Sequence, residues 1–475
     1  MDAFRKLPLL VQTEIFVHLK SELSIKQLAK ASISMQSHFV RFEKSILRRN
    51  IHHTFSKDPT GTLLKDVLGI LFMSDRLKTK EYCEKRLWHT LELRQYSNLE
   101  DLGRIFRLLS RIITFIEDYI TKATSIYPPR SYLGLPDLSS GAGSYFKGQP
   151  LDANKICFTD LTSAEQIRFL RPFLRYELHC KMSLPQFWRR VDEDTAYHHM
   201  LSDLKEAEQP LDPILLTSVH EYYQSIYGAI YAHCQNSWLP DVPAASEAPE
   251  GPSSTSDYGL LYPDTILFDD GEYLRDLRGS CFPQVRSILP CFGLDVLTQL
   301  LLFFGQDRRP INPVGLWVLK HTHYTGMEPL PWVYICKDSD DTTPYLIYDH
   351  LYLGQTVYLE DPVSVGQQHD VRLCQSGCYR NVECKWWLKL HSEQVRIYRQ
   401  RAWGFFDDDR LYPAGHNGFP TLDELSHISR GHWLENSLRR SQRWHDYKAG
   451  KLLDFPRQTP LEPLLHGTID DYLGP

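Results

Sequence analysis

The stretch LPLLVQTEIFVHLKSELSIKQLAKASISMQSHF, residues 7–39, has a pattern of short helices that decides how the N-terminus folds. Pro8 suits the first turn of a helix, where its missing N–H group leaves no hydrogen bond unmade. Behind it, Val11, Ile15 and Leu19 recur at the spacing of one helical face. The sequence therefore predicts a first helix with an apolar stripe.

Two further helices are expected within the same module. Ser24 and Gln27 fit the serine-x-x-glutamine pattern of a capping box, which predicts the start of a second short helix. The apolar residues of the third element are Met35, Phe39, Phe42, Ile46 and Leu47. We therefore expect a compact helical module over residues 1–50.

The region that follows, residues 60–238, is predicted to be mainly helical. Its strongest pattern covers residues 99–121, where eight apolar residues form one stripe: Leu102, Ile105, Phe106, Leu109, Ile112, Ile113, Ile116 and Ile120. More helices are expected at 162–180, where Ser163 and Gln166 fit a capping box, and at 213–237. The Pro-, Gly- and Ser-rich segment 127–150 is predicted to be a surface loop.

The C-terminal half is predicted to combine helices with strands. Residues 239–259 lack apolar periodicity and are expected to form a flexible linker or insertion. Residues 260–475 form an α+β domain, either separate or one unit with 60–238. Helices are expected at 283–305, 383–402 and 421–449, and strands of a small antiparallel sheet at 315–321, 332–337, 343–353 and 355–360. The predicted fold class is therefore mainly α with a small antiparallel sheet.

Composition narrows the class of protein. With 475 residues the chain exceeds the usual size of one core, and 42% hydrophobic and 24% charged residues are typical of a folded protein. A net charge of −6 gives no support to nucleic-acid binding. The ten cysteines include no CxxC pair and follow no signal peptide, which predicts reduced thiols in the cytoplasm or nucleus. No apolar run approaches the roughly 20 residues of a membrane span.

Candidate chemical sites are weak. Cys374, Cys378 and Cys384 lie near His369 and His391, but a structural zinc site needs a second comparable pair, so free cysteines are favoured. The acidic run 407–409 lacks the alternating ligands of a calcium loop, and the glycines of 139–148 lack the order of a phosphate-binding loop. No familiar hydrolase, metalloprotease or kinase motif is present. We therefore predict no catalytic, cofactor-binding or metal-binding residues.

Residues 7–39 resemble an F-box, because Leu7-Pro8, Ile15-Phe16 and Leu19 follow the spacing of that family. Two positions depart from it: Leu10 stands where an acidic residue is common, and Phe39 stands where tryptophan is common. The resemblance implies a surface that binds the Skp adaptor protein. Its contact residues would be Leu7, Pro8, Ile15, Phe16, Leu19, Leu28, Ala29 and Ser32.

The resemblance also implies a function. An F-box protein joins a ubiquitin ligase through the Skp adaptor and, through that, a cullin, while the rest of the chain holds a protein target. The remaining length resembles the uncharacterised C-terminal regions of fungal F-box proteins. We therefore expect an adaptor and no enzymatic activity of its own. Two alternatives stay open, a scaffold that binds the Skp adaptor without a cullin and an enzyme with its site in the C-terminal half.

Overall fold

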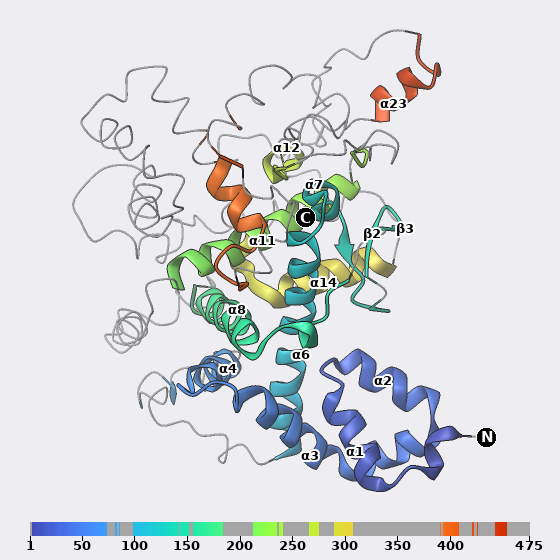
Figure 1. The fold of residues 1–475 in the computed structure, drawn as a ribbon, viewed down its shortest axis with the longest axis vertical. Coiled ribbons are helices and arrows are strands. Elements are labelled where there is room, and N and C mark those ends of the chain that lie inside the picture. Colours follow the sequence, from blue (N-terminus) through green and yellow to red (C-terminus); the bar gives the residue numbers. More distant parts are fainter. Residues whose placement is uncertain are drawn as a thin grey trace, which may run out of the picture. The chain divides into compact units, whose positions relative to one another are not determined.

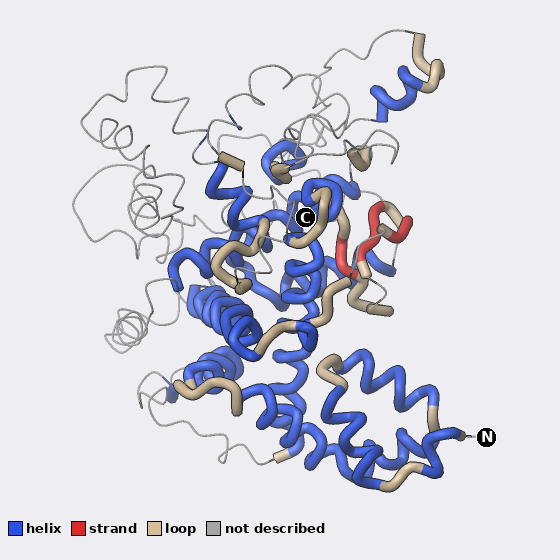
Figure 2. The backbone as a smooth tube through the Cα atoms, in the orientation of Figure 1, coloured by secondary structure: helices blue, strands red, loops and turns tan. Residues whose placement is uncertain are grey.

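The computed structural model of the chain describes residues 2–73, 81–82, 85, 98–141, 143–151, 155–183, 212–234, 237–240, 266–274, 289–306, 390, 393–407, 420–421, 425 and 442–453. In this part helices dominate, accompanied by one small antiparallel sheet (Figures 1 and 2). The predicted fold class, mainly α with a small sheet, is confirmed.

Two compact units divide the chain, each built from segments far apart in sequence. Unit 1 comprises Met1–Thr121, Leu135–Val219 and Cys291–Arg309, and unit 2 comprises Lys122–Gly134, His220–Pro290 and Pro310–Pro475. The predicted boundaries near 50 and 238 fall inside these units. All but the first two residues of the predicted linker 239–259 lie outside the described residues.

Unit 1 begins with the predicted helical module, the dark blue helices of Figure 1. A 3₁₀ turn, η1 (Ala3–Lys6), precedes α1 (Leu9–His18), α2 (Glu22–Ala31) and α3 (Ile33–Phe55). All three predicted helices are present, but α2 starts earlier than predicted. Its N-cap is Ser21, whose side chain accepts a hydrogen bond from the Ser24 backbone N–H at 3.4 Å. The predicted capping box at Ser24 is therefore wrong.

The module packs around a small core of its own. Phe16 is fully buried between α1 and α3, and its ring lies 5.1 Å from that of Phe39. The Thr13 hydroxyl and the His38 ring nitrogen Nε2 are 2.8 Å apart, which ties the same two helices together. The other buried apolar residues of the three helices are Val17, Ile25, Met35, Ile46, Leu47 and Ile51.

The rest of unit 1 contains long helices that pack on one another. They are α4 (Thr62–Phe72), α6 (Leu99–Ala123, whose last two residues belong to unit 2), α8 (Ser163–Ser183) and α14 (Gly293–Gln306), with α4 against α8 and α8 against α14. The predicted stripe of α6 is buried along its length. The start of α8 differs from the prediction. Thr162 and Glu165 form its capping box, with each side chain accepting from the other's backbone N–H.

The segment 127–150 is not a surface loop as predicted. It contains α7 (Pro128–Tyr132), which belongs to unit 2, and the three short strands β1 (Leu135–Pro136), β2 (Ser144–Phe146) and β3 (Gln149–Pro150) of unit 1. The strands pair antiparallel in the order β1-β2-β3, with Leu135 opposite Tyr145. Leu135 is fully buried, so apolar anchoring holds this segment against its unit. The strands predicted between 315 and 360 lie outside the described residues.

Unit 2 is built around α11 (Asp212–Cys234, of which the residues from His220 onward belong to this unit), α12 (Asp270–Leu274), a helical segment at 393–400 and α23 (Gln442–Lys448). One of its buried clusters joins Ile266, Leu267, Leu390, Ile397 and Leu425. Of the predicted helices 383–402 and 421–449, the structure describes residues 390, 393–402, 421, 425 and 442–449. Among the helices that the structure describes, none is long and apolar enough to cross a membrane.

Candidate functional site

The eight contact residues predicted at the N-terminus divide into interior and accessible positions. Phe16 and Ser32 are interior, with exposed fractions of 0% and 3%. The Ser32 hydroxyl caps α3 by accepting from the Met35 backbone N–H, and it donates to Asp2 at 2.7 Å. These two side chains therefore lie in the interior of the module, and the contact predicted for the eight residues stays a prediction. Of the other six predicted contact residues, Pro8 is exposed, and the remaining five are partly buried: Leu7, Ile15, Leu19, Leu28 and Ala29.

Helix α2 is engaged with the rest of unit 1. The Ser110 hydroxyl of α6 accepts a hydrogen bond from the Glu22 backbone N–H at 2.7 Å. Farther along α2, the Gln27 side chain donates to the Ser140 carbonyl at 3.1 Å. The predicted second ridge, Leu28 and Ala29, thus lies on a helix that already has a neighbour within its own unit.

Five other aliphatic side chains of the module are open to solvent. Leu9, Leu10 and Val11, in the first turn of α1, have exposed fractions of 58%, 68% and 40%, and on α3 Ile33 and Val40 reach 80% and 71%. Single exposed apolar residues are ordinary, but these are five of the eleven large ones exposed in the described part of the chain. We call Leu9, Leu10, Val11, Ile33 and Val40 the N-terminal apolar surface.

A hydrogen-bonded connection brings the starts of α1 and α3 together. The Asp2 carboxylate accepts from the Ser32 hydroxyl and from the Ser34 backbone N–H, at 2.7 and 2.9 Å. These bonds lower the pKa of Asp2. The Gln12 amide donates to the carbonyls of Phe4 and Leu7, which fixes η1 against α1. Because η1 is tied to both helices, their first turns lie at the same end of the module.

Ile33 and Val40 share one face of α3. They are seven residues apart, two turns of a helix, and the positions between them on that face are exposed as well. The F-box pattern did not point to any of the five residues of the N-terminal apolar surface. Two of them carried another sequence signal: Leu10 is apolar where the family commonly has an acid, and Val11 belongs to the apolar stripe predicted for the first helix.

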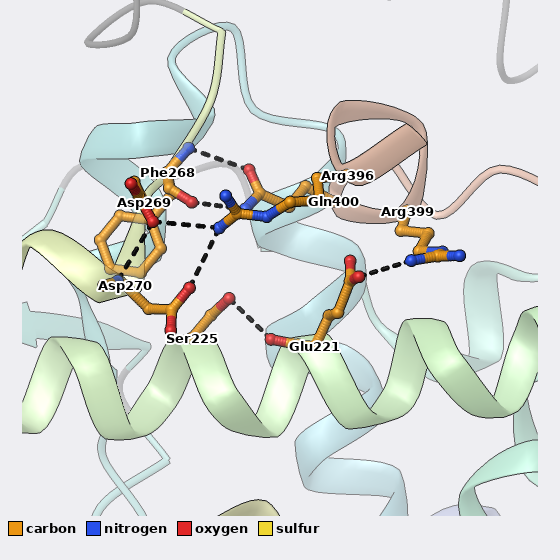
Figure 3. Close-up of polar contacts among 9 residues, drawn as sticks. Glu221, Ser225, Phe268, Asp269, Asp270, Arg396, Arg399 and Gln400 are labelled. Carbon is orange, nitrogen blue, oxygen red and sulfur yellow. Dashed lines mark hydrogen bonds and ion pairs between the residues drawn. The ribbon is translucent and has the colours of Figure 1, made fainter. Parts of the chain in front are cut away.

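Among the described residues of unit 2, a cluster of polar side chains is the most site-like feature (Figure 3). Arg396 donates to both Asp269 and Asp270, at 3.2 and 3.1 Å, and Arg399 pairs with Glu221 of α11 at 2.5 Å. All three carboxylates therefore have an arginine partner. Asp270 and Arg399 are buried, so two of the three ion pairs have one buried partner and hold segments in place.

Gln400 completes the same cluster by binding backbone. Its side-chain oxygen accepts from the Phe268 N–H at 3.0 Å, and its amide nitrogen donates to the Phe268 carbonyl at 2.7 Å (Figure 3). Close packing adds to this, because a Cβ atom on Gly228 of α11 would lie 2.6 Å from the Cβ atom of Asp270. The cluster thus joins α11, residues 266–274 and residues 393–400. Its geometry is that of a structural connection between distant segments.

Buried ionisable groups in unit 1 are also held by partners. Burial raises the pKa of Glu177 to about 7, and its carboxylate accepts from the Leu294 backbone N–H at 2.6 Å. Burial also raises the pKa values of the Cys180 and Cys291 thiols, which makes them poor nucleophiles. Within the described residues no group of three or more His, Cys, Asp or Glu could hold a metal ion. The cysteines 374, 378 and 384 lie outside those residues.

No protein-family model, curated protein or solved structure matches the chain. The class of protein therefore has to be stated from the chain's own geometry. It is a mainly helical protein in two compact units, with an N-terminal three-helix module that exposes aliphatic side chains at one end.

Proposed function

We propose that the protein is a substrate-recognition adaptor of a Skp–cullin–F-box ubiquitin ligase. Residues 1–50 would bind the Skp adaptor, and the rest of the chain would hold an unknown protein target. The observation that carries this proposal is the N-terminal apolar surface, which lies in the stretch whose motif spacing resembles an F-box. The protein would act in the cytoplasm or the nucleus.

The contact differs from the one that the family pattern alone implies. The interior positions Phe16 and Ser32 support the module, and α2 packs within unit 1. The first turns of α1 and α3, beside Leu7 and the exposed Pro8, are left as the surface for a partner. An apolar surface of this kind favours a protein partner with a complementary apolar groove.

The exposed fractions of Leu10 and Ile33 indicate how much binding free energy each side chain would contribute. Fully burying a leucine or isoleucine side chain contributes roughly 1.5–3 kcal/mol. With 68% of Leu10 and 80% of Ile33 exposed, covering what remains would contribute about 1–2 kcal/mol for each residue. Losing both contacts would weaken binding roughly 30- to 700-fold, and a buried charge would weaken it further.

In this function the chain performs no chemistry. It supplies proximity between a target and the ligase, and ubiquitin transfer belongs to other subunits. The carboxylates of the unit 2 cluster fit this division of labour, because each is held in an ion pair, Asp269 and Asp270 by Arg396 and Glu221 by Arg399.

The test is co-purification of the full chain with the Skp adaptor and a cullin. Leu10→Asp/Ile33→Asp should abolish the capture of both proteins while circular dichroism stays unchanged, because both side chains are exposed. Leu453→Asp is the matched control, since Leu453 is 98% exposed outside the module and should not matter. Capture of the adaptor without cullin would favour a scaffold, and failure of the unsubstituted chain to bind the adaptor would refute the proposal.

A further inference from the structure

A hollow lined by basic side chains lies between the last turn of α1 and the second half of α3. Its volume is about 430 Å³, within the range of small-molecule sites. The basic residues that line it are His18, Lys20, Arg48, Arg49, His52 and His53. All of them belong to unit 1, and we call this feature the basic hollow.

The charges of the basic hollow are not balanced. Glu14 is the only acid among the described residues that line it, and Arg49 takes up its charge through an ion pair of 2.5 Å. Lys20 donates to the Val17 carbonyl and the Asn50 side-chain oxygen, at 3.2 and 3.4 Å, and both acceptors are neutral. With neutral histidines the lining therefore has a formal charge of +2, because it contains three cations and one acid. Protonation of the histidines would raise this charge further.

The pKa values show that these cations are close enough to repel one another. Burial, followed by the charge of Lys57, lowers the pKa of Lys20 to about 8. Burial also lowers the pKa of His53, with further contributions from Lys20, Lys57, His18 and His52. An anion in the hollow would relieve this repulsion and raise the pKa values of Lys20 and His53.

A second, smaller hollow continues the basic hollow toward α8. Its volume is about 210 Å³, and it shares His18, Lys20 and His53 with the first. Lys57 lines this smaller hollow and donates to the Gln166 side-chain oxygen at 2.6 Å, which is again a neutral acceptor. The second hollow therefore adds Lys57 to the cations of the basic hollow, and Lys20 lines both.

From this geometry we propose that the basic hollow binds a compact, soluble phosphate-bearing anion, either an inorganic oligophosphate or a small phosphorylated molecule. Arginine and lysine are the usual phosphate ligands, and the exposed Arg48 and the partly buried Lys20 present both kinds. Val17 is the single aliphatic residue that lines the basic hollow, whereas Phe158, Ile167 and Leu170 line the smaller hollow. The basic hollow itself therefore offers charged partners for a phosphate group and no apolar subsite for the flanking side chains of a peptide. This site does not depend on the proposed binding of the Skp adaptor.

The test is isothermal titration calorimetry of the full chain with inorganic tripolyphosphate at 0.15 M salt. We expect saturable one-to-one binding, and Arg48→Glu should weaken it at least tenfold. Arg41→Glu is the matched control. It makes the same charge change seven residues earlier on the same helix, about 10 Å away at 1.5 Å per residue and beyond the Debye length of about 8 Å. It should change the affinity less than threefold.

Three outcomes would overturn the proposal. The unsubstituted chain could give no saturable binding. Arg41→Glu could weaken binding as much as Arg48→Glu, which would make the attraction a diffuse field and not a site. A phosphoserine peptide could bind more tightly than tripolyphosphate, and more tightly than its unphosphorylated form, which would assign the hollow to phosphorylated proteins. Because both arginines are exposed, neither substitution should unfold the chain.

Discussion

Substituting Gly293 by alanine tests how the start of α14 packs against α8. Gly293 has φ of +74°, in the left-handed region, and a Cβ atom there would lie 2.8 Å from Glu177 Oε2 and 3.0 Å from Cys180 Cβ. The left-handed backbone costs alanine roughly 1–2 kcal/mol. Displacing the carboxylate from the Leu294 N–H would leave a buried donor unpaired, which costs about 1–3 kcal/mol more. The expected loss is therefore about 2–5 kcal/mol.

Hydrogen exchange measured by mass spectrometry on peptides from residues 289–306 reports this loss locally. Amide protection there should fall roughly 30-fold to a few thousandfold, at tenfold per 1.36 kcal/mol. Gly103→Ala in α6 is the control, because a Cβ atom there meets nothing within 4 Å and a helix interior favours alanine by about 0.5–1 kcal/mol. Unchanged protection in Gly293→Ala would refute the close approach of Glu177 to α14.

Two further predictions concern buried charges of unit 1. Because burial raises the pKa of Glu177 from 4.5 to about 7, its contribution to stability is complete below pH 4.5 and is lost as the pH rises through 7. In Glu177→Gln, the free energy of unfolding measured with denaturant should no longer fall by about 3 kcal/mol as the pH rises through this range. An unchanged fall would contradict the assignment of the raised pKa to Glu177. Arg175→Ala should destabilise unit 1 by about 3–5 kcal/mol, because it leaves the buried carboxylate of Asp66, 3.1 Å away, without its partner. A thermal unfolding shift as small as that of an exposed-arginine variant would show that the pair contributes little.

Long amphipathic helices could be predicted from the sequence, and their ends could not. The stripe in residues 99–121 gave α6 almost to its bounds, because a pattern repeated over many turns has few other interpretations. The start of α2 was misplaced because serine stands at both 21 and 24, and the local pattern fits either. A distant contact, from the Glu22 N–H to Ser110, accompanies the earlier start. A contact between residues so far apart in the chain cannot be predicted from the local sequence pattern.

A small sheet was predicted, but its strands at residues 135–150 were not, for a different reason. Strands of two or three residues, such as Leu135–Pro136, are too short to show an alternating pattern. A segment rich in Pro, Gly and Ser is typical of a loop, yet Leu133 and Leu135 anchor it in buried surroundings. Composition predicts what a segment of this kind usually does, whereas the burial of a few apolar side chains determines where residues 127–150 lie.

The sequence indicated a segment for the candidate site but not which of its side chains are exposed. Motif spacing directed attention to residues 7–39, but spacing cannot separate a side chain that faces the module's own core from one that faces solvent. Phe16 and Leu10 are both apolar and belong to the same short helix, yet one is fully buried and the other is 68% exposed. Burial depends on where α3 packs, so the five residues of the N-terminal apolar surface required the tertiary structure.

The two proposed sites of the module use opposite ends of the same helices. The N-terminal apolar surface occupies the first turn of α1 and the start of α3, whereas the basic hollow uses the last turn of α1 and residues 48–53. From Ile33 to Arg48 the axis of α3 rises about 22 Å at 1.5 Å per residue, more than two Debye lengths at physiological salt. The charge of Ile33→Asp is therefore screened from Arg48, whereas Leu10 lies only four residues, about 6 Å along α1, before Glu14 of the basic hollow. Since residues as far apart as Ile33 and Arg48, without shared partners, behave additively, loss of the Skp adaptor in Ile33→Asp and loss of tripolyphosphate in Arg48→Glu report separate properties of one module.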